Sequence, residues 1–212
     1  MTLNLYLVRH GQTDYSLGNK FCGSIDPPLN ATGLAMAEAI GARYGRQRWA
    51  AIYASPRLRT RQTAAPTARA AGVEVQIEDG LREIAYGEWE GLAEADVERD
   101  QPERFHAWAA HPGRVSPPGG ETAVEIAARA TAAVDAIRAR HGAGDVLVVS
   151  HKATLRVLIC ALLGVDVDFF RARIAQRVGA ISVVSFKKSG PMLERLGDVS
   201  HLPPELLESD GT

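Results

Sequence analysis

LNLYLVRHG, residues 3–11, is a short apolar run that ends abruptly in an arginine, a histidine and a glycine. This pattern is typical of a strand buried inside a parallel sheet. In open α/β sheets the carboxyl ends of such strands face the ligand crevice, so Arg9 and His10 are expected at its floor. Gly11 allows a sharp turn and a close approach of backbone to a ligand. A strand end whose polar residues face water remains the alternative at this point.

The composition fits one large α/β domain. With 212 residues, 46% of them hydrophobic, the chain can bury a single substantial core. The net charge of -1 gives no reason to expect nucleic acid or an acidic membrane surface as a partner. Two cysteines, Cys22 and Cys160, form no disulfide framework and suit a reducing compartment. No segment has the length of a signal-peptide core or a membrane span, so a cytoplasmic location is expected.

Strands alternate with helices along most of the chain, which predicts a three-layer αβα fold with a mostly parallel central sheet. Residues 1–198 are expected to form a single domain, in which residues 111–120 (HPGRVSPPGG) are a surface loop. Residues 199–212 are expected to form a polar, loosely held C-terminal tail. The strands after the first are expected at 50–54, 73–77 and 145–150, with a terminal hairpin at 180–186 and 192–196.

Capping residues predict the helix limits. Asn30 is expected to cap a helix that buries Leu34, Ala37, Ile40 and Tyr44. Ser55 is expected to cap the next helix, with Pro56 at its first position. That helix would be kinked or restarted at Pro66 and closed by Gly72. Further helices are expected at 93–99, 102–110, 121–141 and 155–163, and the long one would bury Val124, Ala127, Val134 and Ile137.

Two of the predicted strands end in histidine. His10 follows the first strand and His151 follows residues 145–150, so both imidazoles are expected at the same edge of the sheet. Arg59 comes one turn into the helix after another strand, and a helix N-terminus attracts anions. Together with Arg9, these groups suit a tetrahedral dianion, for which phosphate is the natural candidate.

A histidine at a phosphate can do more than bind it. A neutral imidazole can attack phosphorus and carry the phosphoryl group covalently, while arginines neutralise the non-bridging oxygens. The leaving oxygen also needs a proton. Glu83, in the loop after the third strand, is the best placed acid, with Glu88 and Glu90 as rivals.

Five motifs follow one another in an order and spacing that resemble the histidine phosphatase superfamily, with its phosphoglycerate-mutase-like fold. They are LVRHG (7–11), SPxxRxxQTA (55–64), ExxxGxWxG (83–91), GGE (119–121) and VSH (149–151). Each motif alone is weak, but five in the right order are specific. The resemblance runs from about residue 3 to residue 187.

The resemblance implies a role for each candidate residue. His10 would be the phosphoacceptor, and His151, Arg9 and Arg59 would bind the transferring group. Glu83 would protonate the leaving oxygen and then act as the base toward water. No metal and no cofactor are implied.

The expected substrate-binding set, which also includes Arg9 and Arg59, departs from the family pattern in places. Ser16 stands where the family often has asparagine, and Cys22 stands before Gly23 where glutamine is common. Lys152 replaces the small residue that usually follows the second histidine. Lys152 could bind a substrate carboxylate or second phosphate, or merely cap the next helix. These departures leave the identity of the substrate open.

The sequence favours a phosphomonoesterase, a histidine acid-type phosphatase that acts on a small phosphorylated metabolite. The segment from Glu83 to Gly120 is short, whereas mutases of the family usually carry a longer insertion there. A 2,3-bisphosphoglycerate-dependent phosphoglycerate mutase is the alternative, and a catalytically weak scaffold that binds a phospho-ligand is less favoured. The chain has no phosphate-binding P-loop and no Gly-x-Ser-x-Gly elbow. A homodimer, and a role of residues 111–120 as a lid, are left open.

Overall fold

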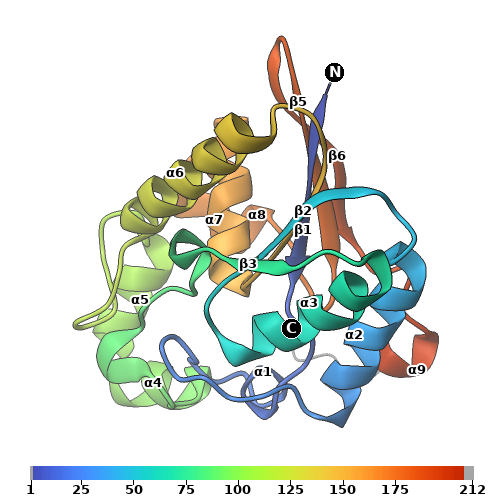
Figure 1. Ribbon diagram of the computed structural model, residues 1–212. Helices are drawn as coiled ribbons and strands as arrows, with labels where there is room; N and C mark the ends of the chain where they lie inside the picture. The colour runs from blue at the N-terminus through green and yellow to red at the C-terminus, as the bar shows by residue number, and fades with distance from the viewer. Residues whose placement is uncertain (1, 208–212) are drawn as a thin grey trace.

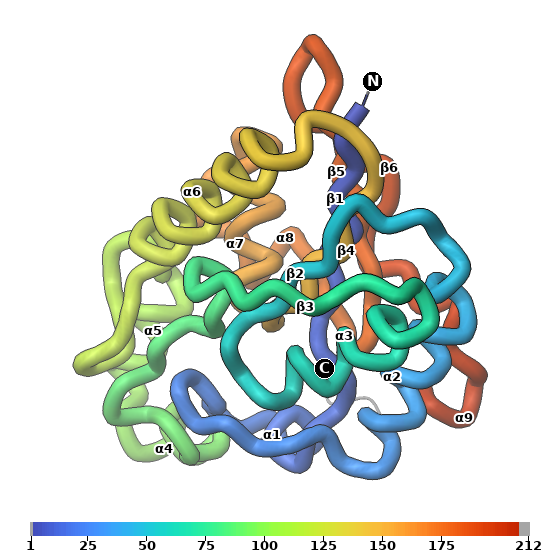
Figure 2. The backbone as a smooth tube through the Cα atoms, in the orientation of Figure 1, coloured from blue at the N-terminus to red at the C-terminus, as the bar shows by residue number. Residues whose placement is uncertain are grey.

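The predicted central sheet is present and mostly parallel. The structure, a computed structural model, describes residues 2–207 of the chain. Within these residues the strands lie in the order β3-β2-β4-β1-β5-β6 (Figures 1 and 2). Strands β3, β2, β4 and β1 are parallel neighbours, whereas β5 is antiparallel to β1 and β6 is antiparallel to β5. The strands are β1 Leu3–Arg9, β2 Trp49–Ala54, β3 Val75–Ile77, β4 Gly144–Ser150, β5 Ile181–Lys187 and β6 Gly190–Asp198.

Helices cover both faces of this sheet, which confirms the three-layer αβα fold. Helices α2 (Ala31–Tyr44) and α3 (Leu58–Ala71) cover one face, and α6 (Ala123–His141) and α7 (Lys152–Leu163) cover the other (Figure 1). The short helices are α1 Asp14–Leu17, α4 Glu94–Asp100, α5 Pro102–Ala110, α8 Phe170–Arg173 and α9 Pro204–Leu207, and the 3-10 turns are η1 Asp79–Leu81, η2 Gly87–Trp89 and η3 Val167–Phe169.

Strand β1 lies in the middle of the sheet because it is buried on both faces. Leu5 and Leu7 belong to the core cluster under α6 and α7, whereas Val8 belongs to the cluster under α2 and α3. All three side chains are fully buried. Successive residues of a strand point to opposite faces, so a mostly apolar run satisfies both layers at once. Arg9 and His10 are thereby carried to the carboxyl edge of the sheet.

The predicted start of the helix after β2 is wrong. Helix α3 begins at Leu58 and not at Pro56, and Ser55 does not cap it. The Ser55 hydroxyl is bound instead to the ring of His151, at 2.7 Å from Nε2. The Asp26 carboxylate accepts the Leu58 N–H with both oxygens, at 2.8 and 3.0 Å, and so caps the helix from a distant loop. The N-terminus of α3 is therefore already occupied by the carboxylate of Asp26. The helix is continuous through Pro66 to Ala71.

Two residues predicted to be buried are exposed. Leu34 of α2 is 46% exposed and Val124 of α6 is 55% exposed. The other predicted residues of α2, Ala37, Ile40 and Tyr44, are buried, and Gly41 shares their face, where a Cβ would lie 2.7 Å from the Cβ of Pro66 in α3. Helices that approach this closely select the face with the smallest side chains, and a count of large apolar residues misses that choice.

The surface loop at residues 111–120 is held against the body of the domain. The Gly113 N–H donates to the Asp168 carboxylate at 2.6 Å, and the Pro118 carbonyl accepts the Glu88 N–H at 2.9 Å. Leu202, in the predicted tail, is buried and packs with Met36 of α2, so residues 199–207 are not loosely held. The remaining residues of that tail, 208–212, lie outside the described part of the chain. The domain boundary at residue 198 stays a prediction.

Candidate active site

A cavity of about 430 Å³ opens at the carboxyl ends of β1 and β4, where the sequence predicts a phosphate site. This main cavity is lined by Arg9, His10, Arg59 and Glu83, which come from three separate stretches of the chain. The structure therefore brings together the residues for which the sequence predicts a shared function. None of residues 111–120 is among the residues that line it.

His10 is held with one ring nitrogen facing its own backbone. Its Nδ1 lies 2.8 Å from the carbonyl oxygen of Gly11, and because a carbonyl only accepts, the proton must lie on Nδ1. The lone pair is then on Nε2. Burial lowers the pKa of His10 well below its ordinary value of 6.5, and the charges of Arg59 and Arg9 lower it further. A neutral imidazole with a free lone pair on Nε2 is a nucleophile at neutral pH.

Gly11 is needed for a close approach of two backbones. A Cβ on this residue would lie 2.5 Å from the carbonyl oxygen of Gly33 in α2. The Gly11 N–H donates to the hydroxyl of Thr63 in α3 at 3.0 Å. The turn after His10 is thus fixed between the two helices of this face.

His151 lies directly behind His10. The ring centroids are 5.3 Å apart and the rings are nearly edge to face, at 64°. The His151 side chain is fully buried, and the Ser55 hydroxyl holds its Nε2. Among the described residues its buried Nδ1 has no hydrogen-bond partner. Burial lowers the pKa of His151 well below 6.5, with a further contribution from Arg59.

The two arginines are fixed by backbone carbonyls. Arg59 is 1% exposed and donates to the carbonyl oxygens of Ile25, at 2.8 Å, and Gly23, at 3.3 Å. Arg9 is also buried and donates from Nη1 to the carbonyl of Gln176 at 2.7 Å. The carbonyls orient both guanidinium groups. Arg59 also lies 3.5 Å from the Asp26 carboxylate, so part of its charge is balanced within the protein.

Glu83 lies at the start of α7. Its Oε1 accepts the N–H of Thr154 at 3.2 Å and that of Ile84 at 3.0 Å, and its Oε2 is 3.4 Å from the N–H of Ala153. The positive end of the helix dipole therefore faces this carboxylate. Trp89 packs in an aromatic cluster with Phe21 and Trp108.

The four remaining residues of the predicted substrate-binding set occupy different positions. Ser16, Cys22 and Lys152 line the main cavity, whereas Gly23 is not among its lining residues and holds Arg59 through its carbonyl. The Ser16 hydroxyl already donates to the carbonyl of Thr13 at 2.9 Å. Burial raises the pKa of the Cys22 thiol to about 11, so this thiol stays protonated. Burial, with the nearby charge of Arg9, lowers the pKa of Lys152 to about 8.

Sequence reasoning missed an outer group of cations in the same cavity. Arg156, Arg171 and Arg177 line it, together with Tyr86 and Gln176. Arg171 is paired with Glu94 at 2.8 Å. No spacing in the sequence points to these arginines, because they come from α7, α8 and the loop that follows.

The low pKa values of His10 and His151 predict that acid destabilises the protein. Both imidazoles stay neutral in the folded chain below pH 6.5, whereas they take up protons once the chain unfolds. The unfolded state then binds more protons, so the free energy of unfolding falls as the pH drops through 6.5. The loss is up to about 1.4 kcal/mol per pH unit for each histidine.

Urea unfolding of the wild type and of His10→Asn between pH 7 and pH 5 checks this expectation. The asparagine amide can still donate to the Gly11 carbonyl but takes up no proton. We expect the variant to lose about 2 kcal/mol less stability than the wild type over this range. Equal losses in the two proteins would contradict it.

The described residues contain neither a membrane-spanning helix nor a cluster of metal ligands. Within residues 2–207, no helix combines the length and the apolar character needed to cross a membrane. In the same residues, no group of three or more His, Cys, Asp and Glu side chains lies in an arrangement that could hold a metal ion. The prediction that the reaction uses no metal stays a prediction.

Comparisons with known proteins agree on one family. A family model described as histidine phosphatase superfamily (branch 1) matches residues 5–199. Phosphoserine phosphatase 1 of Hydrogenobacter thermophilus is 35% identical over 168 residues, which cover 79% of this chain and 80% of the relative. Probable phosphoglycerate mutase GpmB of Proteus mirabilis is 32% identical over 207 residues, which cover 94% of this chain and 95% of the relative.

A solved structure supports the same conclusion for the fold. The native structure of mycobacterial glucosyl-3-phosphoglycerate phosphatase matches this chain with a TM-score of 0.85 and 27% sequence identity. The match covers 93% of this chain and 99% of that chain. The phosphoglycerate-mutase-like fold expected from the five sequence motifs is thereby confirmed.

Proposed function

The chain belongs to the histidine phosphatase superfamily, and from this premise we propose that it is a phosphomonoesterase that works through a phosphohistidine on His10. The single observation that carries the proposal is the environment of His10. A neutral imidazole, with its proton held on Nδ1 by the Gly11 carbonyl, lines the same cavity as two buried guanidinium groups whose charges act on it. Such a group is ready to attack a bound phosphate.

The reaction has two steps. In the first, Nε2 of His10 attacks phosphorus, a P–N bond forms and the P–O ester bond breaks, and Glu83 gives its proton to the leaving oxygen. In the second, water attacks the phosphohistidine, Glu83 takes a proton from that water, and the P–N bond breaks. Inorganic phosphate leaves, and His10 and Glu83 return to their starting states.

Arg9, Arg59 and His151 would stabilise the charge on the transferring group. This role is supported by the way the three side chains are held. Backbone carbonyls fix Arg59 and Arg9, and the Ser55 hydroxyl fixes His151. Groups that are already oriented pay no reorganisation cost when charge develops in the transition state. Ser16 and Cys22 are proposed to bind the substrate because they line the cavity. Gly23 is proposed to contribute indirectly, because its carbonyl positions Arg59.

The substrate is proposed to carry a second anionic group, such as a carboxylate. Among the described residues that line the main cavity, positive side chains outnumber carboxylates well beyond what one phosphate dianion would neutralise. Lys152, which lines this cavity, is proposed as the cation that binds the second group. Two relatives are named as acting on phosphoserine and on glucosyl-3-phosphoglycerate, and both compounds carry a carboxylate. The cations are Arg9, Lys20, Arg59, Lys152, Arg156, Arg171 and Arg177, and the carboxylates are Glu83 and Glu94.

Phosphate release from a panel of esters tests both the activity and the substrate class. We expect release in the presence of EDTA, with kcat/KM higher for phosphoserine, 3-phosphoglycerate and glucosyl-3-phosphoglycerate than for glycerol phosphate. Lys152→Met should lower kcat/KM for the preferred acid by about tenfold, the value of one lost charged contact, and change that for glycerol phosphate much less. Lys188→Met, at an exposed turn, is the matched control. An equal fall for both kinds of ester would contradict the role of Lys152.

A phosphoglycerate mutase is the second candidate, because one relative of nearly the same length is named as a probable mutase. A mutase would transfer the phosphoryl group to a second hydroxyl instead of water. For a mutase, a bisphosphorylated primer would stimulate the transfer of the phosphoryl group between phosphoglycerates. Hydrolysis without such stimulation would favour the phosphatase. The cytoplasmic location and the homodimer stay predictions.

A further inference from the structure

We propose that Arg129 and Glu121 are positioning residues, which hold Glu83 at the right distance from the breaking ester bond. The inference rests on the proposed role of Glu83 as the acid. Neither residue lines the main cavity, and both are mostly buried, with side chains 12% and 16% exposed. They act on Glu83 through the backbone of residues 80–85.

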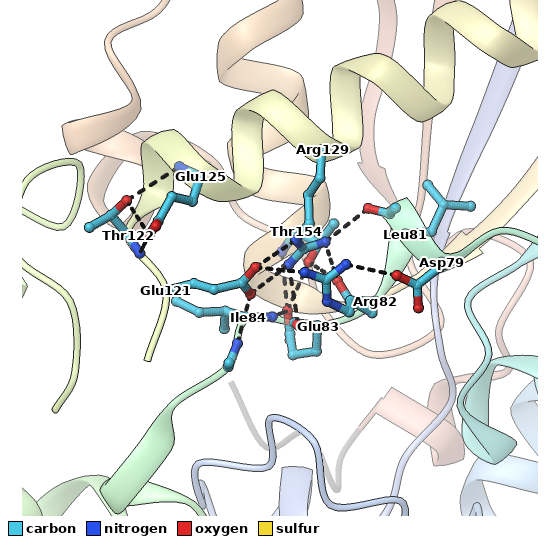
Figure 3. A network of polar contacts seen from close by, with 12 residues as sticks. Asp79, Leu81, Arg82, Glu83, Ile84, Glu121, Thr122, Glu125, Arg129 and Thr154 are labelled. Atoms are coloured by element: carbon cyan, nitrogen blue, oxygen red, sulfur yellow. Dashed lines mark hydrogen bonds and ion pairs between the residues drawn. The ribbon is translucent and has the colours of Figure 1, made fainter. Parts of the chain in front are cut away.

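Arg129 binds this backbone directly. From α6, its Nη1 donates to the carbonyl oxygens of Gly80, at 2.9 Å, and Arg82, at 2.7 Å, and its Nη2 donates to that of Glu83, at 3.2 Å (Figure 3). One planar guanidinium thus collects three carbonyls of a short loop. The compact ammonium group of a lysine could not satisfy the same set in this geometry.

Glu121 orients that guanidinium and binds the far side of the loop. Its Oε1 accepts from Nε of Arg129 at 2.9 Å, and its Oε2 accepts from Nη2 of Arg129 at 3.0 Å and from the Ala85 N–H at 2.9 Å (Figure 3). Burial alone would raise the pKa of Glu121, but the hydrogen bonds from Arg129 and Ala85 hold it below its ordinary value. The carboxylate is therefore ionised at neutral pH.

The two sets of contacts on Glu83 have different effects. The N–H groups of Ala153 and Thr154 at the start of α7 hold its carboxylate, and so fix the direction in which the side chain points. Arg129 and Glu121 fix the backbone from which that side chain projects. Because a general acid must lie within hydrogen-bond reach of the oxygen it protonates, a small shift of this backbone is costly.

A displaced acid slows only reactions whose leaving oxygen needs a proton. p-Nitrophenolate is weakly basic and can leave without one, whereas unsubstituted phenolate is more basic and benefits from protonation. The two esters have nearly the same shape. Their kcat/KM values report the steps up to formation of the phosphohistidine and not its later hydrolysis.

The test compares Arg129→Lys and Glu121→Gln with the wild type on phenyl phosphate and p-nitrophenyl phosphate. We expect kcat/KM for phenyl phosphate to fall by about tenfold or more, and that for p-nitrophenyl phosphate to change by less than about threefold. Glu83→Gln should give the same selectivity with a larger fall. Arg138→Lys, on the same helix and paired with Asp135 at the surface, should leave both values unchanged.

Equal falls for the two esters, or no fall for either, would overturn the proposal. Thermal unfolding of each variant shows whether stability changed, and a lower Tm without ester selectivity would mean that the pair has a structural role alone. Failure of the proposed function gives a different result. The wild type would then release phosphate from neither ester, or Glu83→Gln would keep both rates.

Discussion

Replacing His10 by alanine is expected to abolish turnover, with a loss of kcat on the order of 10⁴-fold or more. The variant lacks the ring nitrogen that would form the P–N bond, so no covalent intermediate can arise. Release of inorganic phosphate from p-nitrophenyl phosphate measures the loss. Alkaline quenching, which preserves phosphohistidine, followed by mass spectrometry of the intact chain, should detect the phosphoryl group on the wild type and none on the variant.

Loss of the nucleophile must be distinguished from loss of the fold, because His10 is buried. His10→Asn keeps a donor for the Gly11 carbonyl, and this variant should unfold near the wild-type Tm at neutral pH while remaining inactive. His111→Ala, whose side chain is 67% exposed and does not line the cavity, is the matched histidine control and should keep full activity. More than a trace of activity in His10→Ala would rule out the covalent step.

The position of the two histidines could be predicted because it depends only on where strands β1 and β4 end. The runs that form β1 and β4 are mostly apolar, so each is recognisable as a buried strand. Buried parallel strands end at a common edge, and the chain places His10 and His151 directly after those ends. Their ring centroids lie 5.3 Å apart, although 141 positions separate them in the sequence.

Side chains whose partners come from elsewhere in the fold could not be predicted. A serine followed by proline has the local pattern of a helix start, but Ser55 binds His151, and Asp26 caps α3 from another loop. Likewise, Arg171 and Arg177 line the cavity only because the chain after α7 returns to it. Local sequence patterns do not predict this long-range packing, because local conformational preferences carry no information about which distant segment will pack against the cavity.

Replacing Glu83 by glutamine is expected to lower kcat/KM for alkyl phosphates by about 10²- to 10³-fold, the usual contribution of a general acid. Glutamine has the same shape, and its amide oxygen can still accept the Thr154 N–H at the start of α7, so the fold should persist. Because Glu83 is also the proposed base in the second step, the variant should accumulate the phosphoenzyme when p-nitrophenyl phosphate supplies a good leaving group. A burst of p-nitrophenol close to one equivalent per chain, followed by slow turnover, would measure this.

The rival carboxylates provide the controls that make the Glu83 assignment specific. Glu88 is exposed, so Glu88→Gln should change neither the rate nor the burst. Glu90 accepts the N–H groups of Ser24 and Tyr86, so Glu90→Gln should affect the loop around Cys22 more than proton transfer. If Glu90→Gln accumulated phosphoenzyme and Glu83→Gln did not, the acid would have to be reassigned. We expect Glu83 to be the acid, because of these three carboxylates it is the one that lines the main cavity together with His10.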